Sequence, residues 1–322
     1  MRISELGERE AIKRLVAHFP EGAYWGIGDD CATIKFGKQL LLVTTDMISE
    51  KFHIPLGATG WQVGWFITAV NLSDIAAKAG QPVGMTLALG VPRSYDIQFL
   101  EDVACGANSC AQMFEMAIIG GDTKEAESLM FTGTAVGVVD QDVFMPRKGA
   151  MKGDIVCVTG SLGSAGAGLY VLNNQSGDEK TAVRRILEVV PRVKEGMALG
   201  AVGGVTSSMD ISDGVASSLY QLQMINDVGF HIYAEKIPVA DYAKNISGGN
   251  RKMERNWSLY TGGDYELLVT IKKNQVSVAQ ESVAGVGGIL SPIGKVTRGE
   301  DIVLESNGEK HVLMNKGFEH FR

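Results

Sequence analysis

Patterns of apolar and polar positions along the chain predict alternating strands and helices. The strands are expected where short apolar, β-prone runs end in turn or polar residues, at 40–46, 83–91, 115–119, 131–139, 155–159, 231–237 and 293–296. The helices are expected where apolar residues recur at helical spacing, at 8–18, 59–79, 97–114 and 181–190, with others beginning at Leu169 and after Gly214. This alternation is typical of an α/β fold.

The predicted helix at 59–79 is apolar except for one stripe. Asn71, Asp74 and Lys78 fall on that stripe, and Gly80 is expected to end the helix as its left-handed C′ residue. The stripe therefore brings an aspartate to one defined face of a helix that is otherwise suited to a core.

The length of 322 residues favours two domains. The segment 146–154 gathers proline, glycines and charges and resembles a linker. We therefore predict an N-terminal domain at 1–145 and a C-terminal domain at 146–322, both of the α/β (α+β) class.

Charge and cysteine content exclude several classes of function. The chain has 30 Lys and Arg against 37 Asp and Glu, a net charge of −7, which disfavours binding to nucleic acid or to anionic membranes. The apolar stretch 52–73 is broken by polar residues, proline and glycines, and the charged N-terminus lacks the apolar core of a signal peptide. The four cysteines form no CxxC pair, so we expect a protein of the reducing cytoplasm.

Aspartates recur beside the predicted turns and strand ends, and this is the main chemical signal. They are Asp29, Asp30, Asp46, Asp122, Asp210, Asp213 and Asp264, with Asp74 on the helical stripe. Each one alone is explained as a helix-capping or turn residue. As a group they indicate carboxylates that hold Mg²⁺ and, through it, a polyphosphate ligand.

Several other features leave two interpretations open. The segment 160–168 is either an anion-binding turn or a site of close helix packing, and Arg147 is either a phosphate ligand or a solvated linker residue. His53 is either a ligand-binding or a surface residue, and Trp61 with Trp65 suggests core or interface packing. No P-loop, Rossmann or GxSxG motif is present, which disfavours those enzyme classes.

The motifs occur in an order that resembles the thiamine-monophosphate kinase family over nearly the whole chain. They are GIGDD, TTD, NLSD, GGDT, RKGAMKGD, DISDG and GGDYEL. The resemblance implies the two-domain fold of the aminoimidazole ribonucleotide synthetase-like superfamily, with an N-terminal domain that dimerises through its sheet and a C-terminal domain that closes over the active site. It also implies ATP-dependent phosphorylation of thiamine monophosphate to thiamine diphosphate, with several Mg²⁺ ions, by a homodimer.

The family's functional residues fall on matching positions of this chain. The resemblance assigns Mg²⁺ binding to Asp30, Thr44, Thr45, Asp46, Asp74, Asp122, Asp210 and Asp213. It assigns ATP contacts to Gly121, Asp122, Arg147 and Ser212, and a substrate contact to His53. Within this set the catalytic roles are expected for Asp46, Asp122, Arg147 and Asp213.

The chain departs from the family pattern at two substrate positions. Gly263 stands where many members have a glutamate, and Asn315 stands where an aromatic residue is common, which leaves Phe318 as the nearest aromatic candidate. The alternatives are aminoimidazole ribonucleotide synthetase, or a regulatory protein that binds nucleotide without acceptor chemistry. The absence of a cysteine before Cys31 disfavours selenophosphate synthetase, and the ending EHFR disfavours the hydrogenase-maturation relative.

Overall fold

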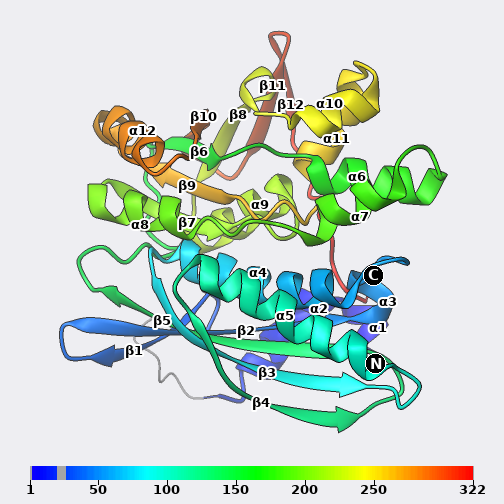
Figure 1. Ribbon diagram of the computed structural model, residues 1–322. Coiled ribbons are helices and arrows are strands. Elements are labelled where there is room, and N and C mark those ends of the chain that lie inside the picture. The colour runs from blue at the N-terminus through cyan, green and yellow to red at the C-terminus, as the bar shows by residue number, and fades with distance from the viewer. Residues whose placement is uncertain (1, 20–26, 322) are drawn as a thin grey trace.

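The computed structural model describes residues 2–19 and 27–321 and contains two β-sheets (Figure 1). One sheet has five strands in the order β1-β2-β5-β3-β4, and the other has seven in the order β12-β11-β8-β10-β6-β9-β7. The prediction of an α/β (α+β) chain with two domains is confirmed. Gly26, which begins the predicted GIGDD turn, lies outside the described residues.

The first sheet is built from the N-terminal part of the chain. Its strands are β1 (Ala32–Phe36), β2 (Gln39–Ser49), β3 (Gln81–Val91), β4 (Ala117–Glu125) and β5 (Met130–Asp140). Its described helices are α1 (Ile3–Leu6), α2 (Glu8–Val16), α3 (Glu50–His53), α4 (Gly60–Ala77) and α5 (Ile97–Met113). The β3–β4 pair is parallel and is joined through α5, whereas the other pairs are antiparallel.

The second sheet is built from the rest of the chain. Its strands are β6 (Ile155–Thr159), β7 (Val205–Asp210), β8 (Gly229–Tyr233), β9 (Leu267–Ile271), β10 (Leu290–Thr297), β11 (Ile302–Ser306) and β12 (Glu309–Val312). Its α-helices are α6 (Ser164–Asn174), α7 (Glu179–Leu187), α8 (Val193–Val202), α9 (Val215–Asn226), α10 (Asp241–Ser247), α11 (Arg251–Tyr260) and α12 (Val276–Gly285). Among the described elements, no helix combines the length and apolarity needed to cross a membrane.

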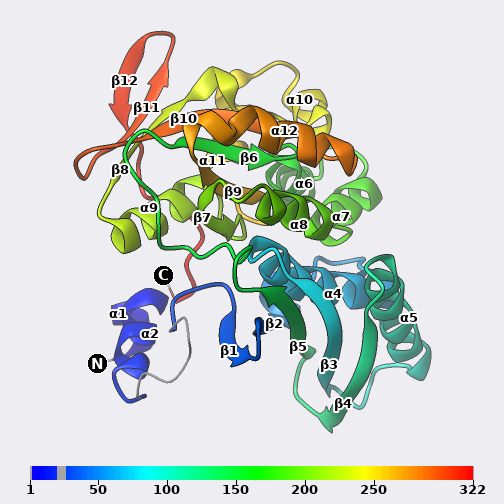
Figure 2. The ribbon, with the colours of Figure 1, turned by 90° about the vertical axis from the view of Figure 1, so that its left-hand side faces the viewer.

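Helix α4 connects the two domains. It lies on the inner face of the first sheet and also contacts α7, α8 and β7 of the C-terminal domain (Figures 1 and 2). Thr59 caps its start: the Thr59 side chain accepts from the Gln62 backbone N–H, and the Gln62 side chain accepts from that of Thr59. Because α4 is enclosed on nearly all sides, its polar residues contact both domains, with Asn71 next to Asp46 of β2 and Ser73 next to Asp210 of β7.

The end of α4 differs from the prediction by one residue. Ala79, not Gly80, adopts the left-handed conformation, with φ of 57°, and the Gly80 backbone N–H donates to the carbonyl of Ile75 at 3.0 Å. A Cβ atom on Gly80 would lie 2.4 Å from Cδ1 of Leu42. Close packing against β2 favours glycine there, the left-handed residue lies one position before the predicted one, and the helix itself ends at Ala77.

Two predicted boundaries are also wrong. Strand β4 continues through the GGDT motif to Glu125, because its pairing with β3 continues as far as Val91. Helix α6 begins at Ser164 and not near Leu169, because the Asp264 carboxylate accepts the backbone N–H groups of Gly163 and Ala165 at 2.6 and 3.1 Å.

The glycine-rich segment 160–168 serves helix packing. A Cβ atom on Gly166 would lie 2.7 Å from Cβ of Trp257, and one on Gly168 would lie 3.0 Å from the carbonyl oxygen of Ala182. The Asp264 carboxylate already occupies the start of α6. Of the two interpretations of this segment, close packing is the one that the structure supports.

Candidate active site

Aspartates from both domains meet beside the inner end of α4. Asp30 precedes β1, Asp74 lies on α4 and Asp210 ends β7, and one carboxylate oxygen from each lies within 4.8 Å of the others. Three acidic segments predicted from the sequence therefore converge on one point: the N-terminal turn, the helical stripe and the end of a strand.

Asp46 and Asp213 belong to the same electrostatic cluster. Burial, with Asp30 and Asp213 as neighbouring charges, raises the pKa of Asp46 to about 6. Burial and the charge of Asp30 raise the pKa of Asp210 to about 7, and burial together with Asp46 and Asp210 raises that of Asp74 well above its usual value. These carboxylates repel one another, so the cluster favours a bound cation.

Short polar side chains orient the aspartates. The hydroxyl of Thr44 donates to Asp74, and the hydroxyl of Ser73 donates to Oδ2 of Asp210 at 2.7 Å. The backbone N–H of Asp46 donates to Oδ1 of Asn71 at 3.2 Å. Neither Ser73 nor Asn71 is among the predicted site residues, although both lie in the NLSD motif of α4.

Two cationic side chains face the cluster. Arg147 donates from Nε to Oδ1 of Asp30 at 2.9 Å, and Lys78 lies with Nζ 2.8 Å from Oδ2 of the same residue. Lys78 also pairs with Oδ1 of Asp29 at 2.6 Å. The sequence placed Lys78 on the polar stripe without a functional role, and it placed Asp29 in the group of acidic residues expected to hold Mg²⁺. The sequence signal for Lys78 was its spacing of four residues from Asp74, which places both side chains on the same face of the helix.

Thr45 and Asp122 lie away from the cluster. Along β2 the side chains of Thr44 and Asp46 face α4, so that of Thr45 faces the opposite side of the sheet, where its hydroxyl donates to the carbonyl of Gly133. Asp122 of β4 pairs with Ala88 of β3, and its exposed side chain lies on that outer face. Its Oδ1 is 3.2 Å from Nζ of Lys124.

The strand register also separates Gly121 from the cluster. Asp46 pairs with Gly133, Gly133 with Leu87, and Leu87 with Gly121. Three inter-strand spacings, about 14 Å in all, therefore lie between Asp46 and Gly121. A single chain brings the predicted metal ligands Asp30, Asp46, Asp74, Asp210 and Asp213 together without Asp122.

The predicted substrate residues His53 and Phe318 meet through the C-terminal tail. His320 contacts both rings, with centroids 5.5 Å from His53 and 4.7 Å from Phe318, and it also contacts Phe52. The Phe318 backbone N–H donates to the carbonyl of Asp213 at 3.4 Å, which connects this aromatic group to the acidic cluster. Asn315 is exposed.

His53 has a defined ring orientation. Its Nδ1 accepts the backbone N–H of Ser49 at 3.1 Å. Burial and the nearby His320 lower the pKa of His53, so the ring is neutral near pH 7. With Nδ1 as acceptor, the proton of the neutral ring is on Nε2, which is then a hydrogen-bond donor.

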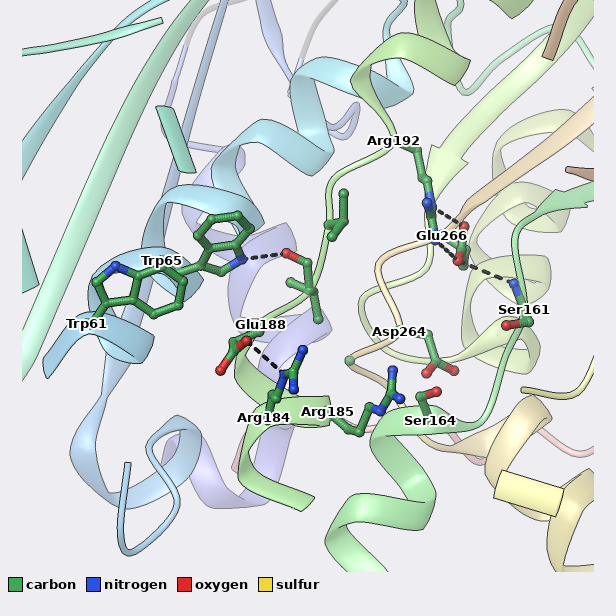
Figure 3. A pocket seen from close by; sticks show the side chains of 13 residues that line it. Trp61, Trp65, Ser161, Ser164, Arg184, Arg185, Glu188, Arg192, Asp264 and Glu266 are labelled. Carbon is green, nitrogen blue, oxygen red and sulfur yellow. Dashed lines mark hydrogen bonds and ion pairs between the residues drawn. The ribbon is translucent and has the colours of Figure 1, made fainter. Parts of the chain in front are cut away.

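A cavity of about 490 Å³ lies between α4, α7 and the loop before β9 (Figure 3). Gly263, with φ of 98°, is one of its lining residues. On one side Trp65 stacks on Trp61 with centroids 5.1 Å apart and donates from Nε1 to the carbonyl of Val189 at 2.7 Å. The tryptophan pair thus packs at the domain interface, as its spacing suggested, and it also borders the cavity.

Charged groups line the rest of this cavity. Arg192 and Glu266 form a bidentate pair, with Nε–Oε2 and NH2–Oε1 distances of 2.7 and 2.6 Å (Figure 3). Burial raises the pKa of Asp264 to about 7. Ser212 lies beyond the cavity lining, where its carbonyl accepts the backbone N–H of Gly263 at 2.8 Å.

The donor set of the cluster fits a hard divalent cation. Its candidate ligands are carboxylate and hydroxyl oxygens, which Mg²⁺ prefers. Asp46, Asp74, Asp210 and Asp213 are the members without a described ion pair to Lys or Arg.

Comparison with known proteins identifies the family. The model of the AIR synthase related protein N-terminal domain matches residues 28–139, and that of the C-terminal domain matches 151–307. The thiamine-monophosphate kinase of Methanospirillum hungatei JF-1 is 34% identical over 91% of this chain and 92% of its own. The chain belongs to the AIR synthase related protein family, in its thiamine-monophosphate kinase branch. The resemblance inferred from the motifs is confirmed.

Two further relatives agree with this family membership. The thiamine-monophosphate kinase of Escherichia coli K12 is 32% identical over 92% of this chain and 91% of its own. The solved structure described as AaThiL complexed with AMPPCP and TMP superposes with a TM-score of 0.87 at 27% identity, covering 99% of both chains.

Proposed function

We propose that this protein transfers the γ-phosphoryl group of ATP directly to the phosphate of thiamine monophosphate, giving thiamine diphosphate and ADP. The observation that carries the proposal is the convergence of Asp30, Asp74 and Asp210 from both domains on one point, with Asp46 as a neighbouring charge. The fit over 99% of both chains to a relative that binds an ATP analogue and TMP supports the choice of reaction.

Mg²⁺ is proposed to bind at Asp46, Asp74, Asp210 and Asp213, with Thr44 as a neighbouring hydroxyl ligand. The bound ions would screen the negative charge of the phosphates. Their carboxylate ligands come from two domains, so metal binding would also fix the domains relative to one another. Asp30 is not included, because both of its oxygens already face cations.

The acceptor needs no general base under this proposal. A phosphate monoester with a second pKa near 6 is mostly a dianion at pH 7 and is already a nucleophile. The protein must hold the acceptor phosphate in line with the phosphates of ATP, so catalysis depends on positioning and on electrostatic stabilisation. Arg147 would supply positive charge to ATP, and Ser212 lies in the turn after β7 where it would contact the nucleotide.

The acceptor is proposed to bind beside the C-terminal tail. His53 would donate from Nε2 to the acceptor phosphate, and Phe318 would pack on a ring of the thiamine moiety. Gly263 has no side chain and lines the 490 Å³ cavity, so the cavity has room for the rest of the acceptor. This arrangement accounts for the lack of a glutamate at position 263.

A homodimer is proposed to form through the outer face of the N-terminal sheet. Phe36, Met47, Val83 and Ile119 expose apolar side chains there, with 67% of Phe36 and 64% of Ile119 accessible. The mass of the particle in solution tests this proposal. The parent should have twice the chain mass, and Ile119→Asp should lower it to that of one chain; a parent of single-chain mass would contradict it.

We place the protein in the cytoplasm, because ATP is its proposed co-substrate and its cysteines are unpaired thiols. Nucleic acid and membranes are not proposed as partners.

The experiment that tests the function is ADP release by the purified protein with Mg·ATP, in the presence and absence of thiamine monophosphate. We expect ADP release that depends on the acceptor and a product with the mass of thiamine diphosphate. Nucleotide binding without acceptor-dependent ADP would contradict the proposal and favour a regulatory nucleotide-binding protein. Free thiamine is the matched control acceptor, because it lacks the phosphate nucleophile.

A further inference from the structure

Lys78 is completely buried at the end of α4, and its ammonium group is enclosed by oxygen atoms. Nζ lies 2.6 Å from Oδ1 of Asp29 and 2.8 Å from Oδ2 of Asp30, and it donates to the carbonyl oxygen of Ser208 at 2.8 Å. Three oxygens therefore lie within 2.8 Å of the ammonium nitrogen, and two of them belong to carboxylates whose negative charge offsets the cost of burying the lysine.

These oxygens have the composition of a cation-binding site. Two carboxylates and one backbone carbonyl converge on Nζ, and hard divalent cations bind the same kinds of oxygen ligand. The oxygens come from the N-terminal turn and from β7 of the other domain, whereas the cation comes from α4. The ammonium thus occupies the position that an ion would take at this junction.

Asp30 differs from the other aspartates of the cluster for this reason. Its Oδ1 faces Arg147 and its Oδ2 faces Lys78, while Asp74 and Asp210 accept hydrogen bonds only from the hydroxyls of Thr44 and Ser73 among their described side-chain partners. A divalent ion bound to Asp30 would lie close to two fixed positive charges in a buried site, where repulsion is strong.

The pKa directions agree with this geometry. Burial alone would raise the pKa of Asp30, but the charges of Arg147 and Lys78 outweigh burial and lower it. The pKa values of Asp74 and Asp210, which form no ion pair, are raised, although the more distant charge of Arg147 partly offsets the effect at Asp210. The contacts themselves divide the cluster, since the cations of the protein face Asp30, whereas Asp74 and Asp210 are left without an ion pair.

We propose that Lys78 is a built-in cation that fills one ion position of the cluster, so that divalent ions assemble on Asp46, Asp74 and Asp210 and not on Asp30. Lys78 acts as a positioning residue, because it holds Asp29, Asp30 and the Ser208 carbonyl in place without contacting the reacting atoms. The inference rests on the proposed function only in requiring that divalent ions bind here with nucleotide.

The first test counts Mn²⁺ bound per chain by electron paramagnetic resonance, with the ATP analogue AMPPCP present. Lys78→Met removes the charge at similar length and leaves three oxygens without a cation, so we expect it to bind about one more Mn²⁺ per chain than the parent. Lys78→Arg keeps the charge and should bind the parental number. A folded Lys78→Met variant with the parental number and affinity would overturn the inference.

The second test does not depend on Lys78 variants. Asp30→Asn should keep the parental number of Mn²⁺ ions, whereas Asp74→Asn should lose at least one. If Asp30→Asn loses an ion as Asp74→Asn does, Asp30 is a ligand and the inference is overturned. Failure of the proposed function has a different signature. A parent that binds Mn²⁺ with AMPPCP but releases no acceptor-dependent ADP would contradict the function and leave this inference standing, whereas a parent that binds no Mn²⁺ would overturn both.

Discussion

At the residue scale, the aspartates of the cluster lie close together, but their pKa values are shifted in different directions. Asp30 has two cationic neighbours and a lowered pKa, whereas Asp46 and Asp210 lack ion pairs and have pKa values raised to about 6 and 7. Burial raises the pKa of all three carboxyl groups, and the ion pairs with Lys78 and Arg147 reverse the direction at Asp30. Small changes at single residues should therefore have different effects on catalysis and on stability.

Asp46→Asn tests the proposed role of the cluster in catalysis. The variant keeps the shape of the side chain but removes a charge that would hold Mg²⁺, so we expect kcat to fall by about 10²- to 10³-fold. Because removing a repelled buried carboxylate relieves strain between like charges, the melting temperature without metal should stay the same or rise. Steady-state kinetics and thermal unfolding measure the two effects.

The matched control for this variant is Asp301→Asn, at an exposed position. It should leave kcat within about twofold, since surface charges far from a site contribute little. Full activity of Asp46→Asn would contradict the metal assignment.

The raised pKa values also predict how stability depends on pH. In the unfolded chain Asp46 and Asp210 titrate near 3.8, and in the folded chain near 6 and 7. Between these values the folded state binds more protons, so their contribution to stability is complete below pH 3.8 and is lost as the pH rises through 6 and 7. Stabilisation by Mg²⁺ should increase over the same range, because its ligands must be deprotonated.

The measurement is the melting temperature between pH 5 and 8, in EDTA and in Mg²⁺. The two curves should diverge as the pH rises. Parallel curves would show that these carboxylates are not the ions' ligands.

At the element scale, the sequence was most informative where one helix or strand is determined by its own pattern. The apolar runs located β2, β3, β5 and β6 within a few residues, and the capped helix α4 began one residue after its predicted start. The errors occurred where distant partners decide the boundary. Strand β4 includes a glycine pair because β3 pairs with it, and α6 begins early because Asp264 satisfies its first N–H groups.

Helix α4 is positioned by close contact with α5, and this contact depends on glycine. A Cβ atom on Gly64 would lie 1.9 Å from the backbone oxygen of Val103. We expect Gly64→Ala to push the helices apart and to lower the free energy of unfolding by about 1–3 kcal/mol, despite the higher helix propensity of alanine. Urea denaturation measures the effect.

Gly285→Ala on α12 is the matched control, because no heavy atom lies within 4 Å of its added Cβ. It should leave the stability unchanged or raise it slightly. If Gly64→Ala is as stable as this control, the close contact between α4 and α5 does not determine their spacing.

At the scale of the whole molecule, the motifs correctly grouped the aspartates of the cluster but also included residues that lie outside it. They predicted that Asp30, Asp46, Asp74, Asp210 and Asp213 belong together, and the fold brings them together. They could not predict that Thr45 and Asp122 face the other side of the sheet, because side-chain direction depends on strand register. The ion pairs of Lys78 likewise depend on contacts between domains.

The position of Asp122 predicts cooperation between two chains. Asp122 lies on the outer sheet face, where we propose that a second copy binds, so its assigned role is most simply performed in the partner's site. Mixing inactive Asp46→Asn and Asp122→Asn proteins under conditions that exchange subunits should then restore activity, because one site of each mixed dimer has both residues intact. If Asp122 serves its own chain, each site carries one lesion and the mixture stays inactive.

Direct phosphoryl transfer is tested by following the γ-phosphoryl group itself. Purified protein would be incubated with Mg²⁺, ATP labelled at the γ-phosphorus and thiamine monophosphate, with Asp46→Asn in parallel. Direct transfer at the carboxylate cluster predicts that the label appears in the terminal phosphate of thiamine diphosphate, in a one-to-one ratio to ADP, and that the variant forms little of it. Label recovered only as inorganic phosphate, or retained in ATP, would contradict the account.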